Sequence, residues 1–159
     1  GAAMLLLASE EAVKEFKLPV MGKLIDSQWA GLEPAQMGLG PVHAVTPILQ
    51  RNELSIKDID YWEINEAFAA QVLSCMAAWE DDAYCKEELS LDAAVGKIDQ
   101  SRLNIDGCGV SLGHPVGASC ARIVLHLLNV LQRKKAQRGI ASLCIGGGQG
   151  GAMLIECGK

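Results

Sequence analysis

The chain has 159 residues, of which 50% are hydrophobic and 21% are charged, and its formal net charge is −5. This length and composition are typical of one folded domain and exclude a disordered chain. The acidic balance provides no basic face for nucleic acid. No apolar run reaches the roughly 18 residues that a membrane-spanning helix needs.

Six cysteines are many for a chain of this length. They form no C-x-x-C pair, and the three histidines do not fall at zinc-ligand spacings, so we expect no metal site. Reduced thiols are typical of cytosolic compartments. We therefore expect a bacterial cytoplasmic protein, with the mitochondrial matrix and the peroxisome as the alternatives.

The first residues, 1–8, form an apolar stretch that predicts a buried strand. A chain that opens inside a core element resembles part of something longer, so we interpret residues 1–159 as one domain of a longer protein. Ser9 is a predicted N-cap for a helix that ends at Lys17.

Strands and helices are predicted to alternate through the first half of the chain. We expect a strand at 20–26, a loop at 30–41, a helix at 41–51, a turn at 54–58 and a strand at 59–64. Pro47 predicts a kink or an early end of the 41–51 helix. A further helix is expected from Glu66 onward. Its predicted buried stripe consists of Phe68, Ala69, Val72, Leu73 and Met76.

The second half begins with an acidic stretch, 77–102, which we interpret as a surface insertion with some helix. A long helix is predicted after Pro115, followed by two strands, 139–145 and 152–156, around a glycine-rich connection. The predicted apolar face of this helix consists of Ala121, Val124, Leu125, Leu128 and Leu131. The element order predicts a layered α/β domain, with helices on both faces of a mixed sheet of about five strands.

Two polar residues stand where catalytic groups often occur. Asn65 follows a predicted strand, and catalytic groups often lie at the carboxyl ends of strands in α/β sheets. An N-cap role is the alternative for Asn65. His114 precedes a proline, which keeps its backbone extended and off the following helix, so its side chain projects from a fixed loop. His43 and His126 lie within helical patterns and are interpreted as surface or packing residues.

Cys144 is delivered by an apolar run into a loop of five glycines and one glutamine. Glycines permit positive φ and close backbone approach, so such a loop can direct N–H groups at a ligand beside the thiol. The alternative is a tight hairpin with a buried structural cysteine, since free cysteines are usually small core residues.

Three motifs in this order resemble the C-terminal signatures of the thiolases (acyl-CoA acetyltransferases). They are Asn65-Glu66-Ala67-Phe68, Gly113-His114-Pro115 and Cys144-Ile145-Gly146, with supporting matches at 37–42 and 58–60. Each motif alone is weak, but three in order are specific. The chain departs from the family pattern at Cys108 and Cys120, where glycine is common.

The resemblance implies an α-β-α thiolase-like C-terminal domain and a role for each motif. Cys144 would be the base that removes or returns the substrate α-proton, and a modest fall of its pKa from about 8.5 would favour the thiolate. His114 would activate a nucleophilic cysteine and donate to the thioester oxygen, and Asn65 would hold a water at that oxygen. The Gly146 N–H would serve a second oxyanion hole. Ala67 and Phe68 would line the acyl pocket.

The resemblance also implies the reaction, which is CoA-dependent cleavage of 3-ketoacyl-CoA or the reverse condensation of acetyl-CoA. Acyl-CoA and CoA would be the substrates, with no cofactor, and the full enzyme would be a homo-oligomer. The length of 77–102 favours a degradative thiolase of fatty-acid oxidation. The half that carries the nucleophile is absent, so we expect this chain alone to be inactive. Two alternatives are a decarboxylating condensing enzyme and a non-catalytic domain for assembly or acyl-lipid binding.

Overall fold

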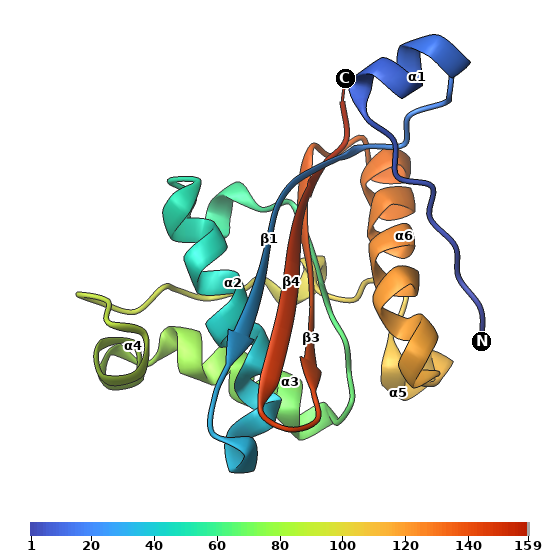
Figure 1. The fold of residues 1–159 in the computed structure, drawn as a ribbon. Coiled ribbons are helices and arrows are strands. Elements are labelled where there is room, and N and C mark those ends of the chain that lie inside the picture. The colour runs from blue at the N-terminus through green and yellow to red at the C-terminus, as the bar shows by residue number, and fades with distance from the viewer. Residues whose placement is uncertain (159) are drawn as a thin grey trace.

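A computed structural model describes residues 1–158, and it shows one mixed sheet with helices on both of its faces (Figure 1). The strands are β1 (Lys23–Gly31), β2 (Tyr61–Ile64), β3 (Arg138–Ile145) and β4 (Gln149–Glu156), in the spatial order β1-β4-β3-β2. β2 and β3 are parallel, whereas β4 is antiparallel to both β1 and β3. The layered α/β prediction is confirmed.

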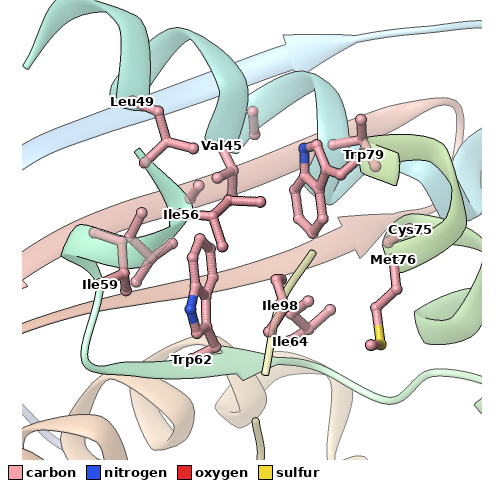
Figure 2. Packing of buried hydrophobic residues seen from close by; sticks show 14 of the residues in the cluster. Val45, Leu49, Ile56, Ile59, Trp62, Ile64, Cys75, Met76, Trp79 and Ile98 are labelled. Carbon is pink, nitrogen blue, oxygen red and sulfur yellow. The ribbon is translucent and has the colours of Figure 1, made fainter. Parts of the chain in front are cut away.

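One face of the sheet is covered by α2 (Gly40–Arg51) and α3 (Ala69–Glu80). The larger core lies between them and the strands, and Figure 2 shows Trp62 of β2 and Trp79 of α3 close together within it. The two indole centroids are 6.0 Å apart. The burial of apolar side chains such as these is the main favourable contribution to the free energy of folding.

The opposite face is covered by α6 (Val116–Lys134), which packs on β2 and β3. The helix was predicted, but its buried stripe differs from the predicted one. Leu128 and Leu131 are buried as expected, whereas Ala121, Val124 and Leu125 are only half-buried. Ile123, Leu127 and Val130, which were not in the predicted stripe, are buried as well. The stripe is therefore rotated toward the sheet.

The predicted first strand is wrong. Residues 1–8 have no regular secondary structure, and Met4, Leu6 and Leu7 are largely exposed. Helix α1 (Glu10–Phe16) follows, and Ser9 caps it by accepting a hydrogen bond from the Ala12 N–H, as expected. An apolar run specifies a buried strand only where another strand pairs with it, and residues 1–8 have no such partner in the described chain.

The sheet has four strands rather than about five. Beyond β2 there is only an isolated bridge between Trp62 and Leu103. Asn104, at φ 47°, then turns its side chain onto the strand: its Oδ1 accepts from the Ile64 N–H at 3.0 Å, and its Nδ2 donates to the Ile64 carbonyl at 2.9 Å. One amide side chain thus replaces a neighbouring strand.

Two predicted boundaries are also corrected. β1 continues to Gly31, beyond the predicted start of the loop, because residues 26–31 pair without interruption with β4. A short helix, η1 (Pro34–Leu39), occupies most of the rest of that loop. Helix α2 continues through Pro47 to Arg51 instead of ending early. Eight of its twelve residues are buried, and this packing outweighs the loss of one backbone hydrogen bond.

The stretch 77–102 is attached to the main core at several points. It contains the end of α3, helix α4 (Asp82–Leu89) and the short helix η3 (Gln100–Arg102). Although many of its side chains are exposed, Trp79, Cys85 and Ile98 are fully buried. The interpretation of 77–102 as a surface insertion stays a prediction.

The remaining short helices are η2 (Ile56–Asp58) and α5 (Gly109–Leu112). No helix within residues 1–158 is long and apolar enough to cross a membrane. The same residues bring together no group of three side chains suited to hold a metal ion.

Candidate active site

The three sequence motifs meet at one edge of the sheet. Asn65 directly follows β2 and Cys144 lies near the end of β3; because these strands are parallel, both residues lie at the same edge. The Asn65 N–H donates to the Ser142 carbonyl at 2.9 Å, which extends the pairing past β2. His114 lies just before α6. Such an edge is the usual location of active sites in α/β sheets.

His114 is held in one tautomer by Ser119, a buried residue on the first turn of α6. The Ser119 Oγ lies 2.7 Å from the His114 Nδ1 and 3.4 Å from the Pro115 carbonyl. The Ser119 hydroxyl donates a hydrogen bond to the Pro115 carbonyl, and its oxygen accepts a hydrogen bond from the Nδ1–H of His114. The Nε2 atom therefore carries no proton and has a lone pair. Nε2 faces the Asn65 Nδ2 at 3.4 Å. The ring is therefore oriented as a base.

The loop before His114 is fixed by Arg122. The Arg122 Nη1 donates to the Gly113 carbonyl at 2.8 Å. Gly113 has φ 89°, a conformation that side chains disfavour, so glycine suits this position. The imidazole projects from a rigid support, as the sequence predicted from Pro115.

Asn65 is fully buried, and its predicted alternative role as a helix N-cap is wrong. The N-cap of α3 is Phe68, and the helix begins only at Ala69. The Cys108 Sγ approaches the Asn65 Oδ1 at 4.0 Å. The carboxamide is thus free to bond within the site rather than to a helix end.

Glu66 is a site residue whose role the sequence did not reveal. One of its carboxylate oxygens accepts from the Asn104 Nδ2 at 3.0 Å, and the other accepts from the Val110 N–H at 3.0 Å. A Cβ at Gly109 would overlap the Glu66 carbonyl, so the two backbones touch. These contacts dock the 104–113 loop onto the Asn65 motif.

Cys144 lies at the same edge but on the other side of the sheet. Side chains alternate along a strand, so Cys144 shares the α2/α3 side with Ile140, whereas Asn65 shares the α6 side with Glu63. Within residues 1–158 no hydrogen bond joins Cys144 to His114 or Asn65. The structure thus pairs His114 with Asn65 directly and adds Cys144 from the opposite face.

Burial raises the pKa of the Cys144 thiol, contrary to the expected fall. The residue is only 6% exposed, and a thiolate loses its hydration there. Cys144 is therefore a protonated thiol at neutral pH in this chain. A group in that state is suited to give a proton rather than to take one.

The glycine-rich connection after Cys144 is compact. Gly147 and Gly148 have φ of 89° and 81°, and the Leu32 N–H donates to the Gly148 carbonyl at 2.9 Å. Gly150 touches Gly40 at the start of α2 so closely that a Cβ at Gly150 would overlap the Gly40 carbonyl. Gly146 is exposed, so a ligand can reach its backbone.

Exposed apolar side chains surround the His114 and Asn65 motifs. We call them the exposed apolar group; they are Phe68, Val110, Leu112 and Val116, and they are between 58% and 75% exposed. Phe68 was predicted in the buried stripe of α3, and so was Leu73, which is also exposed. Ala67, the other predicted pocket residue, is half-buried. Periodicity identified an apolar stripe but not the neighbour that would cover it.

A surface hollow of about 460 Å³ opens beside His114. It is lined by Gly1, Ala2, Leu112, Gly113, His114, Pro115, Ala118 and Arg122. The imidazole is therefore accessible from outside the chain, as a group that reacts with a ligand must be.

Known proteins resemble this chain in sequence and in structure. The family model described as "Thiolase, C-terminal domain" matches residues 18–157. The mitochondrial 3-ketoacyl-CoA thiolase of Rattus norvegicus is 38% identical over 156 residues, and the acetyl-CoA acetyltransferase of Thiocystis violacea is 39% identical over the same length. Each match covers 98% of this chain and 35% of the relative.

A solved structure of human mitochondrial 3-ketoacyl-CoA thiolase in complex with CoA superimposes with a TM-score of 0.79 and 37% identity. It covers 96% of this chain, whereas this chain covers 34% of the human protein. The chain thus spans about a third of the length of these relatives. The family match, the shared structure and the three motifs at one sheet edge show that the chain belongs to the thiolase family and corresponds to its C-terminal domain.

Proposed function

We propose that the chain provides the C-terminal catalytic half of a thiolase, which cleaves 3-ketoacyl-CoA with CoA or condenses acetyl-CoA in reverse. The observation that carries the proposal is the His114–Asn65 pair, in which Ser119 fixes the imidazole tautomer and Nε2 is left as a base. CoA thioesters are the proposed substrates, without a further cofactor. The names of the relatives, and the CoA bound to the human one, support this choice.

Each residue has one role in the proposed reaction. The His114 Nε2 takes the proton of a cysteine nucleophile, and Asn65 and the Gly146 N–H stabilise the oxygens on which negative charge develops. In cleavage, the thiol of Cys144 gives its proton to the α-carbon of the departing enolate, which leaves as a thioester. The raised pKa of Cys144 supports this direction, because the thiol is the form that donates.

The proposed partner is the half of the enzyme that carries the nucleophile. Five of the six cysteines are buried, and Cys120, the exposed one, lies on α6, where no hydrogen bond within residues 1–158 joins its thiol to a histidine. The exposed apolar group supports the proposal, since exposed patches of this kind are typical of protein contacts. A homo-oligomer is proposed for the complete enzyme. A bacterial cytoplasm or a mitochondrial matrix is the proposed compartment, in line with the named relatives.

A thiolysis assay tests the proposal. The chain is incubated with acetoacetyl-CoA and CoA, first alone and then with the separately produced N-terminal part of a thiolase. We expect no turnover alone and turnover in the mixture, lost in His114→Ala and Cys144→Ala and kept in the control Cys120→Ser. Intact-mass measurement shows which polypeptide carries the acyl group. Turnover by the chain alone, or full activity of Cys144→Ala in the mixture, would overturn the proposal.

A further inference from the structure

A cluster of charged side chains connects three segments on the α6 side of the sheet. The His126 Nδ1 lies 2.7 Å from the Glu63 Oε1, and its Nε2 lies 3.0 Å from the Asp106 Oδ2. Arg133, about two helical turns further along α6, also bonds to Asp106. Glu63 is almost fully buried, whereas Asp106 and Arg133 reach solvent. No step of the proposed reaction uses any of these groups.

The His126 ring lies between two carboxyl groups. Both ring nitrogens are within hydrogen-bond distance of a carboxyl oxygen, one from Glu63 and one from Asp106. The ring therefore bridges β2 to the loop that carries Asp106.

The other charged or titratable groups near this bridge are few. Glu66 and Asp106 oppose ionisation of Glu63, and Arg133 offsets the charge of Asp106. Burial raises the pKa of the Glu63 carboxyl to about 7, while His126 acts in the opposite direction. Cys108 is buried beside the same carboxyl groups. The bridge thus combines a buried carboxyl group, an imidazole ring and an ion pair at the surface.

The three bridged segments are those that carry the His114–Asn65 pair. Glu63 lies two residues before Asn65 on the same side of β2. Asp106 lies two residues before Cys108, whose Sγ approaches Asn65. His126 belongs to α6, the helix that His114 precedes. A shift of α6 against β2 would change the 3.4 Å contact between Asn65 and His114.

We propose that His126 is a positioning residue: its ring fastens α6 and the 104–108 loop to β2 and so keeps Asn65 within hydrogen-bond reach of His114. Its effect on catalysis rests on the proposed thiolase function, but its effect on geometry does not.

The geometric effect is tested by NMR on the 159-residue chain with ¹⁵N-labelled side chains. In His126→Gln, we expect the Asn65 carboxamide and His114 ring signals to shift, because the bridge between α6 and β2 is lost. Asp106→Asn, at an exposed position, should produce a smaller shift of the same signals. His43→Gln is the matched control, because His43 bonds to Tyr84 from α2 on the other face.

The catalytic effect is tested in the mixture with the N-terminal thiolase part. We expect kcat of His126→Gln to fall roughly 10- to 100-fold with KM unchanged, as small misplacements of catalytic groups cost about that much. Unshifted Asn65 and His114 signals in both His126→Gln and Asp106→Asn would overturn the inference. Shifted signals together with an inactive wild-type mixture would leave the inference standing and refute the thiolase proposal.

Discussion

The two faces of the sheet differ in kind, and β2 shows the difference within four residues. Trp62 and Ile64 point into the apolar core under α2 and α3, whereas Glu63 lies against α6, and Asn65 continues on that side. The first face buries the larger apolar core. The second buries a smaller apolar cluster under α6 and also holds the charged and polar groups around Glu63 and Asn65. Alternation along this short strand therefore places the larger core and the polar contacts of β2 on opposite faces.

The largest expected effect is on the apolar face. Trp79→Ala removes a fully buried indole and its 3.2 Å hydrogen bond to Thr46, and we expect a loss of about 3–5 kcal/mol in the free energy of unfolding. Urea denaturation measures it. Trp29→Ala, at a residue 64% exposed, is the control and should change stability little. Equal losses in both variants would mean that the two faces do not differ as described.

Gly150→Ala should cost about 3 kcal/mol, because its Cβ would meet the Gly40 backbone, which cannot move aside as a flexible side chain can. Gly146→Ala is the matched control: no atom lies within 4 Å of its Cβ, and the N–H proposed for the oxyanion hole is retained. Thermal unfolding compares the two. A stable Gly150→Ala protein would refute the close packing of α2 against β4.

Ser119→Ala tests the polar face. It leaves the His114 Nδ1 without its partner, and we expect a loss of about 1–2 kcal/mol together with a mixture of ring tautomers in the ¹⁵N spectrum. Ser74→Ala removes a comparable bond to a helical carbonyl at an exposed position of α3 and serves as the control. An unchanged His114 spectrum in Ser119→Ala would show that the tautomer is fixed by something else.

The last prediction concerns the pH dependence of stability. The pKa of Glu63 is raised from 4.5 to about 7, so the folded state keeps a proton that the unfolded chain releases. The resulting stabilisation is present below pH 4.5 and is lost as the pH rises to about 7. Glu63→Gln should abolish this slope, and denaturation at several pH values measures it.

The pH experiment must account for His43, which also titrates in this range, and it needs a control variant. The lowered pKa of His43 gives an opposite slope near its usual pKa of 6.5, but it is present in both proteins and cancels in their difference. Glu33→Gln, an exposed carboxyl, is the control and should behave like the wild type. If Glu63→Gln kept the wild-type slope, the raised pKa of Glu63 would be wrong.

The sequence predicted the parts of the fold that local chemistry determines. Pro41 near the start of α2, the proline after His114 and the glycines between β3 and β4 each specify their own backbone, and these elements are confirmed. Family resemblance supplied His114, Asn65 and Cys144, and the structure brings them to one edge. Their chemical roles stay predictions.

What the sequence did not predict depends on neighbours from distant segments. Residues 1–8 have the composition of a strand, but no strand in the described chain pairs with them. Phe68 has the helical spacing of a buried residue, but no other segment of residues 1–158 packs over it, and it is exposed. His126 was interpreted as a packing residue because a helical pattern does not show that Glu63 and Asp106 lie on either side of it. Ser119 was overlooked for the same reason.

The side chain of Asn104 also has a consequence for association. By occupying the N–H and carbonyl of Ile64, it closes the outer edge of β2 to any added strand. At the other end of the sheet, the outer edge of β1 pairs with no strand in the described chain. Aggregation by strand addition should therefore begin at β1, where the irregular register between Leu24 and Asp26 and the Asp26–Arg51 ion pair hinder it.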